Sequence, residues 1–368
     1  MNIGLCGFGV VGRGVYEIVR QRPDMKVKKI LCLEDIQLPD AQTVKDFSEI
    51  LNDPEIDTVV EAMGGLHPSY DFARAALEAG KNVVSSNKAM VCTFYDELIP
   101  LAMRKSVSLR CTAAVGGGIG WLSELERARR VQTINQVGGI MNGTCNYILD
   151  NMTRLGLGYD EALKQAQKLG YAEANPATDV DGIDTWHKVI LSANVAFGIS
   201  LDKATVPVSG IRNISAADVD CFKAHGKVCK LISTAKRTED GFSAYVQPTL
   251  VDVGSPEGAV PLNYNLITFI GQTSERMSFY GQGAGRYPTA YNVVQDLVDV
   301  TQGKSFYAPY GAPQAADNQE THRYYVRGNW EGSIQEDWST GVVTAPVPVS
   351  QMHQWVKDHP NAFIAAVD

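Results

Sequence analysis

A glycine triplet near the start of the chain constrains the fold more than any other feature. Gly7, Gly9 and Gly12 follow a short apolar run over residues 1–6 and precede a helical pattern that extends to residue 20. In this context the first glycine permits a tight turn, the second lets the backbone approach a pyrophosphate, and the third allows close helix–strand packing. The phosphates would bind at the helix N-terminus. We therefore predict a dinucleotide-binding turn that comprises Gly7, Phe8, Gly9, Val10, Val11 and Gly12.

Strand-like and helix-like segments alternate after this turn. This matters because a glycine triplet alone is a weak signal, which any glycine-rich turn can match. Alternation of this kind is typical of a parallel sheet covered by helices on both faces. We expect an N-terminal Rossmann-type domain over residues 1–115, to which residues 286–313 return through a helix. The strand-like segments are residues 26–33, 58–62, 82–85 and 107–113, and residues 70–78 and 291–300 have helical periodicity.

The pattern changes near the glycine-rich residues 116–120. Two β-rich blocks, at residues 133–142 and 242–251, flank a largely helical middle. We therefore expect a mixed α/β domain over residues 116–285, which makes the whole chain an α/β protein. Residues 314–368 look loop-rich and are expected to form a short C-terminal appendage. Within it we expect a strand at residues 323–327, a helix at residues 351–357 and a strand at residues 362–367.

Composition limits the classes of function. The 368 residues suffice for two domains, and 45% of them are apolar and 20% charged, with a net charge of −8. No long basic run occurs, which argues against nucleic acid or an anionic membrane as the main partner. The seven cysteines form no C-x-x-C pair and no histidine pair has metal-ligand spacing, so we expect free thiols and no zinc. Without a signal-like segment or a long apolar run, the expected location is the cytoplasm.

Two acids follow the second predicted strand at the position that selects between nicotinamide cofactors. Glu34 and Asp35 lie about twenty residues after Gly12, where an acid would bind the ribose 2′-hydroxyl and repel a 2′-phosphate. This favours NAD over NADP. Arg13 directly follows the glycine triplet and could still compensate for the acids.

An acidic segment ends in a lysine on a predicted helix. Asp184 and Lys188 are four residues apart, so they share one face of the first helical turns. Glu173 and Asp179 lie in the irregular approach to this helix, where the backbone could aim them at the same point. A solvated loop with one ordinary ion pair is the simpler interpretation. The density of acids beside an apolar helix favours instead a site that binds an ammonium group and transfers a proton.

This segment closely resembles the signature of homoserine dehydrogenases. Several unlike residues match that signature at fixed spacing, which makes the resemblance specific. The matching residues are Gly170, Tyr171, Glu173, Pro176, Asp179, Gly182, Asp184 and Lys188.

Three further segments resemble the same family. Asn87 and Lys88 follow a strand and would otherwise be a surface turn. Gly143 and Thr144 follow another strand, and Thr144 could simply cap the following helix. The run that contains Gly285 would otherwise be a glycine-rich linker. The resemblance implies that Asn87, Lys88 and Gly285 lie at the cofactor and that the turn of residues 143–144 binds the substrate carboxylate.

The implied reaction is the reversible NAD(P)-dependent reduction of L-aspartate 4-semialdehyde to L-homoserine. By the resemblance, Lys188 is the main acid–base group at the substrate oxygen, assisted by Lys88, and Asp184 orients Lys188 or contacts the substrate. Glu173 and Asp179 would hold the substrate ammonium. A homodimer is also implied, with the second domain's sheet as its contact.

The sequence departs from the family in two places. Relatives often bind a monovalent cation through a glutamate and backbone carbonyls of a Val-Gly-x-Gly turn. Here Thr112 takes the place of that glutamate, although the carbonyls of Val115, Gly117 and Ile119 remain candidates for Na⁺ or K⁺. The C-terminal residues are too few for a complete threonine-sensing domain, but could form a truncated regulatory-like unit.

Two alternative functions are compatible with the glycine triplet. A dehydrogenase of another small amino acid would keep it, but would not be expected to keep the register of residues 170–188. A catalytically silent NAD sensor would need neither Lys88 nor Lys188.

Overall fold

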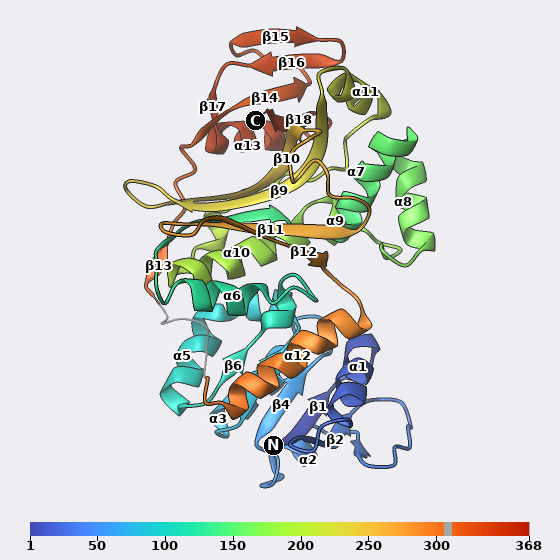
Figure 1. Ribbon diagram of the computed structural model, residues 1–368, viewed down its shortest axis with the longest axis vertical. Helices are drawn as coiled ribbons and strands as arrows, with labels where there is room; N and C mark the ends of the chain where they lie inside the picture. Colours follow the sequence, from blue (N-terminus) through green and yellow to red (C-terminus); the bar gives the residue numbers. More distant parts are fainter. Residues whose placement is uncertain (305–310, 368) are drawn as a thin grey trace. The chain divides into compact units, whose positions relative to one another are not determined.

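The computed structural model describes residues 1–304 and 311–367, which form two compact units (Figure 1). The first unit comprises Met1–Val131, Gly198–Ser200 and Gln282–Ala312. The second comprises Gln132–Phe197, Leu201–Gly281 and Pro313–Asp368. Residues 305–310 of the segment predicted to return to the first domain lie outside the described residues, as does residue 368.

The first unit contains a six-stranded parallel sheet in the order β3-β2-β1-β4-β5-β6. The prediction of an N-terminal Rossmann-type parallel sheet is therefore confirmed. The strand order reverses between β1 and β4, and such reversals mark the ligand crevice at the carboxyl ends of the strands. The strands are β1 (Asn2–Cys6), β2 (Lys26–Leu31), β3 (Gln42–Val44), β4 (Thr58–Glu61), β5 (Asn82–Ser85) and β6 (Leu109–Arg110).

Helices cover both faces of this sheet. On one face α1 (Val10–Val19) and α12 (Arg286–Thr301) pack together, and Val15, Val293 and Leu297 share a core with Leu5 and Val60. On the other face α3 (Ser69–Glu78) packs against α5 (Tyr95–Lys105). The shorter helical elements are α2 (Ser48–Leu51), α4 (Lys88–Thr93), η1 (Thr112–Ala114) and α6 (Trp121–Ala128). The strand predicted at residues 107–113 is shorter than expected, because the chain turns into η1 after β6.

The second unit contains a mixed ten-stranded sheet, with the continuous order β12-β11-β7-β9-β10-β18-β14-β16-β15 and with β17 paired to β14. The long central strands alternate in direction, whereas β10 and β18 are parallel. The strands are β7 (Ile134–Ile140), β9 (Lys227–Arg237), β10 (Phe242–Asp252), β11 (Tyr264–Gly271), β12 (Glu275–Gln282), β14 (Thr321–Arg327), β15 (Ile334–Trp338), β16 (Gly341–Thr344), β17 (Val347–Pro348) and β18 (Phe363–Val367).

One helix of this unit carries the acidic segment's lysine. α10 (Ile183–Phe197) packs against β7, β9 and β10, and its residues from Lys188 onward are buried. A helix that is buried on nearly every side holds its polar side chains in fixed positions. The remaining elements are α7 (Gly143–Leu155), α8 (Tyr159–Lys168), α9 (Ala177–Val180), α11 (Ala216–Ala224), α13 (Val349–Asp358), β8 (Ser200–Leu201), η2 (Lys203–Thr205) and β13 (Pro313–Gln314).

The compact units differ from the predicted domains at two boundaries. Residues 116–131, including α6, group with the first unit. Residues 313–367 do not form a separate loop-rich appendage, because β14, β15, β16 and β18 continue the second unit's sheet and α13 covers them. Tyr324, Met352 and Ile364 belong to the core of this part. The predicted strands and helix of the tail are present, but the expectation of loops between them was wrong.

Candidate functional site

The glycine turn of the first unit has the geometry that its motif requires. Gly7 adopts a φ of +96°, and a Cβ atom at this position would lie 2.7 Å from the carbonyl oxygen of Ala62. A Cβ on Gly12 would lie 2.1 Å from the carbonyl oxygen of Gly7. Gly9 is the N-cap of α1, and nothing lies within 4 Å of where its Cβ would be. Packing thus explains glycine at positions 7 and 12, whereas the open space at Gly9 fits a ligand that approaches the backbone.

The acids after β2 are exposed, and each forms an ion pair. Arg13 Nη2 lies 3.2 Å from Glu34 Oε2, and Arg13 Nε donates to the carbonyl oxygen of Phe8 at 3.0 Å. Asp35 pairs with Lys45 at 2.8 Å, and this hydrogen bond lowers the pKa of the Asp35 carboxyl below its usual range. Glu34, expected to favour NAD, and Arg13, which could favour NADP, therefore form an ion pair with each other.

Asn87 and Lys88 lie at the carboxyl end of β5, beside the carboxyl end of β4. Asn87 is the N-cap of α4: its Oδ1 accepts from the amide of Met90 at 3.1 Å, and its Nδ2 donates to the carbonyl oxygen of Gly65 at 2.7 Å. Lys88 is the first residue of α4 and is half-buried. Both residues thus lie at the carboxyl ends of the strands, where ligands bind in open α/β folds.

Gly285 and the predicted cation-binding turn also belong to the first unit. Gly285 is the N-cap of α12 with a φ of +131°, a conformation that favours glycine. In the turn after η1, Gly117 O accepts from Asn292 Nδ2 at 2.5 Å, and Ile119 O accepts from the amide of Trp121 at 2.7 Å. The carbonyls of Val115, Gly117 and Ile119 were predicted to bind Na⁺ or K⁺. Those of Gly117 and Ile119 are therefore already hydrogen-bonded.

The second unit contains a buried ion pair at the start of α10. Lys188 Nζ lies 2.7 Å from Asp184 Oδ2, one helical turn earlier, and the two side chains are only 9% and 7% exposed. Lys188 Nζ also donates to the carbonyl oxygen of Met141 at 2.7 Å. Met141 immediately follows β7, so the lysine spans from α10 to the end of a central strand. The pairing confirms that Asp184 and Lys188 share one helical face.

Asn142 connects this pair to the second acid of the segment. Its Nδ2 donates to Asp184 Oδ2 at 2.8 Å and to Asp179 Oδ1 at 2.7 Å. Its Oδ1 accepts from the amide of Cys145 at 2.7 Å, which makes Asn142 the N-cap of α7. One buried amide group therefore holds both carboxylates at a fixed separation. Neutral donors between two acids also reduce the repulsion between them.

A second asparagine reaches the same carbonyl group as Lys188. Asn265 lies in β11, is fully buried, and donates from Nδ2 to the carbonyl oxygen of Met141 at 3.0 Å. Lys188 and Asn265 thus share one acceptor, which places the ammonium group between α10 and the sheet. Asn265 Oδ1 is buried and has no hydrogen-bond donor among the described residues.

Of the other predicted substrate residues, Gly143 and Thr144 begin α7, whereas Glu173 lies on the surface. Thr144 donates from its hydroxyl to the carbonyl oxygen of Tyr171 at 2.6 Å, so it does not cap its own helix as the simpler interpretation supposed. Gly143 is the first residue of α7, where a Cβ would lie 2.5 Å from the carbonyl oxygen of Asn263. Glu173 is exposed, and its backbone carbonyl accepts a hydrogen bond from Gln167 Nε2 at 3.1 Å. The structure therefore brings Asp179, Asp184 and Lys188 together, but not Glu173.

Sequence reasoning missed the groups that organise this cluster: Asn142, Asn265 and the carbonyl of Met141. An asparagine directly before Gly143 and Thr144 is a signal for a helix N-cap, and it could have identified Asn142. No pattern in the sequence points to Asn265, since its role depends on the pairing of β11 with β7.

Within residues 1–304 and 311–367, no three His, Cys, Asp or Glu side chains are arranged to hold a metal ion. None of the helices in this part of the chain is long and apolar enough to cross a membrane.

Comparisons with known proteins cover both units. A family model described as "Homoserine dehydrogenase, NAD binding domain" matches residues 7–111, and one described as "Homoserine dehydrogenase" matches residues 121–298. The homoserine dehydrogenase of Bacillus subtilis (strain 168) is 34% identical over 330 residues, which cover 84% of this chain and 76% of the relative. That of Lactococcus lactis subsp. lactis (strain IL1403) is 34% identical over 367 residues, which cover 93% and 84%.

Solved structures agree with these relatives. The crystal structure of a homoserine dehydrogenase from Thiobacillus denitrificans superposes with a TM-score of 0.87 at 27% identity and covers 100% of this chain and 98% of that one. A homoserine dehydrogenase from S. aureus at pH 7.5 gives a TM-score of 0.78 at 27% identity. The matches include both the nucleotide-binding turn and the acidic cluster, and the chain therefore belongs to the homoserine dehydrogenase family of NAD(P)-dependent oxidoreductases.

Proposed function

We propose that the cluster around Lys188 catalyses the reversible interconversion of L-homoserine and L-aspartate 4-semialdehyde. The observation that carries this proposal is the buried Lys188 ammonium, held by Asp184 and by the Met141 carbonyl. Asn142 links Asp184 to a second acid, Asp179. Asp184 and the Met141 carbonyl use two of the three N–H groups of Lys188. Among the described residues the third has no acceptor, and we assign it to a substrate oxygen.

Lys188 is assigned the proton transfer. The nicotinamide, when bound, accepts or supplies the hydride. In oxidation a neutral Lys188 takes the hydroxyl proton as the hydride leaves the carbinol carbon. In reduction its ammonium form gives that proton to the carbonyl oxygen as negative charge develops there. Asp184 orients the amine and stabilises its charged form. Lys88 is assigned the role of assisting lysine on the family resemblance.

The acids and the start of α7 are assigned to the substrate's amino-acid end. Asp179 and Asp184 supply negative charge for an ammonium group, and we assign Glu173 to the outer part of the same site. Among the described residues, none accepts a hydrogen bond from the amides of Gly143 and Thr144, which begin a 13-residue helix. Such amides are suited to a carboxylate.

We also propose that NAD is used in preference to NADP. Glu34 follows β2 at the position where an acid binds a ribose 2′-hydroxyl. Arg13, the cation that could attract a 2′-phosphate, is paired with Glu34 at 3.2 Å. The Glu34 carboxylate therefore acts twice, because it repels the phosphate and neutralises the nearest guanidinium.

A homodimer through the sheet of the second unit is the proposed assembly. β12 is the last strand at one edge of this sheet, and its apolar Met277 and Tyr280 are 42% and 54% exposed. Exposed apolar edge strands readily pair with another chain. Light scattering after size exclusion should give twice the 40.0 kDa of one chain, and a mass of one chain would contradict the dimer.

The assay that tests the proposed reaction measures nicotinamide reduction with L-homoserine, with NAD and NADP in parallel. Clear turnover with NAD preferred is the expected result. Turnover with NADP preferred would keep the reaction and reject the role given to Glu34. Binding of NAD without turnover would reject the reaction itself.

A further inference from the structure

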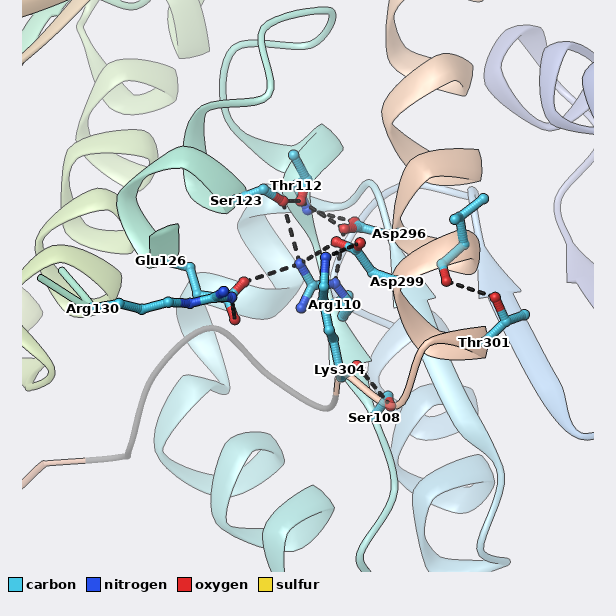
Figure 2. A network of polar contacts seen from close by, with 11 residues as sticks. Ser108, Arg110, Thr112, Ser123, Glu126, Arg130, Asp296, Asp299, Thr301 and Lys304 are labelled. Carbon is cyan, nitrogen blue, oxygen red and sulfur yellow. Dashed lines mark hydrogen bonds and ion pairs between the residues drawn. The ribbon is translucent and has the colours of Figure 1, made fainter. Parts of the chain in front are cut away.

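The turn at residues 115–119 is where the family resemblance places a monovalent cation, so its fit to such an ion can be tested. A cation needs oxygen ligands that are not already used and negative charge that is not already balanced. The residues around η1, α6 and α12 of the first unit decide both points (Figure 2).

Thr112, at the position of the expected glutamate, is bound to an acid of α12. Its amide donates to Asp296 Oδ2 at 2.7 Å, and its hydroxyl donates to Asp296 Oδ1 at 2.6 Å. Asp296 is fully buried, and burial raises the pKa of its carboxyl above the usual range while Arg110 and Thr112 oppose this rise. Both oxygens of the nearest carboxylate are therefore occupied by protein donors.

Arg110 supplies a permanent cation at this place. Its side chain is fully buried, with Nε 3.1 Å from Asp296 Oδ1. Its Nη2 lies 2.8 Å from Asp299 Oδ2 and 3.3 Å from Glu126 Oε2. A guanidinium stays protonated at any pH at which the protein is folded, so this positive charge is always present.

The cluster is electrically balanced without an added ion. Lys304 Nζ lies 2.7 Å from Asp299 Oδ1, and Arg130 Nη2 lies 3.2 Å from Glu126 Oε1. Three acids, Asp296, Asp299 and Glu126, therefore face three bases, Arg110, Lys304 and Arg130 (Figure 2). A bound Na⁺ or K⁺ would bring a positive charge that no remaining carboxylate of this cluster compensates.

Two of the three candidate carbonyls of the turn are likewise engaged. Gly117 O accepts from Asn292 on α12, and Ile119 O accepts from the amide of Trp121. A Cβ on Gly117 would lie 2.5 Å from the carbonyl oxygen of Gly283, so the backbone is closely packed on that side. The turn is thus held by α12 and its approach rather than by an ion.

We propose that Arg110 is a built-in cation that takes the place of a bound monovalent cation in this chain. Stability of the fold, and turnover if the proposed function holds, are then independent of Na⁺ and K⁺. Thr112 lacks the carboxylate that would attract an ion, and Arg110 supplies the positive charge that Asp296 and Asp299 of α12 require.

The first test measures thermal unfolding of the full chain in NaCl, KCl and choline chloride at equal ionic strength. The expected result is the same melting temperature in all three salts. A saturable rise that is specific to Na⁺ or K⁺ would overturn the proposal. This readout does not use the enzymatic reaction, so its failure is distinguishable from failure of the proposed function. Homoserine oxidation in the same salts should likewise be equal.

A variant pair tests the role of Arg110 directly. Arg110→Met keeps much of the side-chain volume and removes the charge, so the melting temperature should fall by roughly 10 °C. Guanidinium or K⁺ at low concentration should then restore part of the loss. Arg130→Met, which removes an exposed base of the same cluster, should show neither effect.

Two outcomes of this pair would contradict the proposal. One is a folded Arg110→Met protein that responds to cations no more than Arg130→Met does. The other is a cation response in Arg110→Lys, which retains the charge. If Arg110→Met does not fold, the salt comparison on the unmodified chain and on Arg110→Lys still decides the question.

Discussion

Lys188 Nζ lies 2.7 Å from Asp184 Oδ2, and both side chains are buried at the start of α10. Removing one partner of such a pair leaves an uncompensated buried charge, which costs about 3–5 kcal/mol. A fold retains this arrangement most readily where a substrate uses the charge. Variants at this pair should therefore lower both stability and turnover, so the turnover of each variant is compared with its melting temperature.

The variant Asp184→Asn should lower kcat for homoserine oxidation by roughly 100-fold, a typical loss for a disturbed acid–base group. Without the carboxylate, the amine of Lys188 loses the partner that holds it in position at 2.7 Å. Steady-state rates at saturating homoserine would measure the loss. Asp181→Asn is the matched control, because Asp181 is a half-exposed acid of the same segment that pairs with Arg212. Equal effects of the two variants would contradict the role of Asp184.

Asn142→Asp should raise the KM for homoserine at least about tenfold. Aspartate is as good an N-cap as asparagine, so α7 keeps its cap. The new carboxylate, however, would face Asp179 and Asp184 within hydrogen-bond distance and repel both. Comparison with Thr178→Ala, an exposed neighbour of Asp179, controls for general disturbance. Unchanged KM and kcat in Asn142→Asp would show that the position of Asp179 and Asp184, as fixed by Asn142, does not matter for substrate binding.

Removal of Glu34 should weaken the discrimination against NADP. Glu34→Ala frees Arg13 for a 2′-phosphate and removes a like charge, so the NADP-to-NAD ratio of kcat/KM should rise about tenfold, or roughly 1.4 kcal/mol. Glu49→Ala removes an exposed acid of α2 and should leave the ratio unchanged. A ratio in Glu34→Ala equal to that of the unmodified chain would reject the assignment.

Acid should destabilise the fold through His353. Its Nε2 lies 3.0 Å from Gln247 Oε1, and burial, with a smaller effect of Lys357, lowers its pKa from 6.5 to about 3. Below pH 6.5 His353 binds a proton in the unfolded chain, whereas in the folded chain it stays neutral until the pH approaches about 3. Stability is therefore lost as the pH falls from 6.5 towards about 3, by about 2 kcal/mol at pH 5.

Urea unfolding at pH 7 and pH 5 measures this loss. His353→Gln can keep the contact with Gln247 but cannot titrate, so the difference between the two pH values should shrink by roughly 1–2 kcal/mol. An equal pH dependence in both proteins would remove His353 as the cause.

Local spacing predicted the part of the site that lies within one element. The four-residue separation of Asp184 and Lys188 is sufficient to place them on one helical face, and the glycine triplet has a meaning that depends on a single turn. The N-cap position of Asn142 could be recognised locally, but its contacts with two acids and the contact of Asn265 with Met141 could not, because they depend on segments far apart in the sequence. Glu173 is close to the other acids in sequence, yet an exposed backbone bend separates it from them.

The same distinction explains the fold. The parallel sheet of the first unit follows from strands and helices that alternate along the chain. The strands predicted in the C-terminal segment are present, but their place in the second unit's sheet was missed because their partners are distant: Thr249 of β10 pairs with Ala366 of β18. β15 and β16 are short and partly exposed, so they lack the apolar pattern that identifies a buried strand.

The oxidation of L-homoserine with saturating NAD, compared between the unmodified chain and Lys188→Met, tests the central claim most directly. We predict that kcat of Lys188→Met falls by about 10³-fold, while its NAD binding, measured by fluorescence, stays unchanged. The control is Lys164→Met, which changes an exposed lysine of α8 and should leave the melting temperature unchanged. Lys164→Met should also keep normal turnover. Near-normal turnover by Lys188→Met would contradict the account.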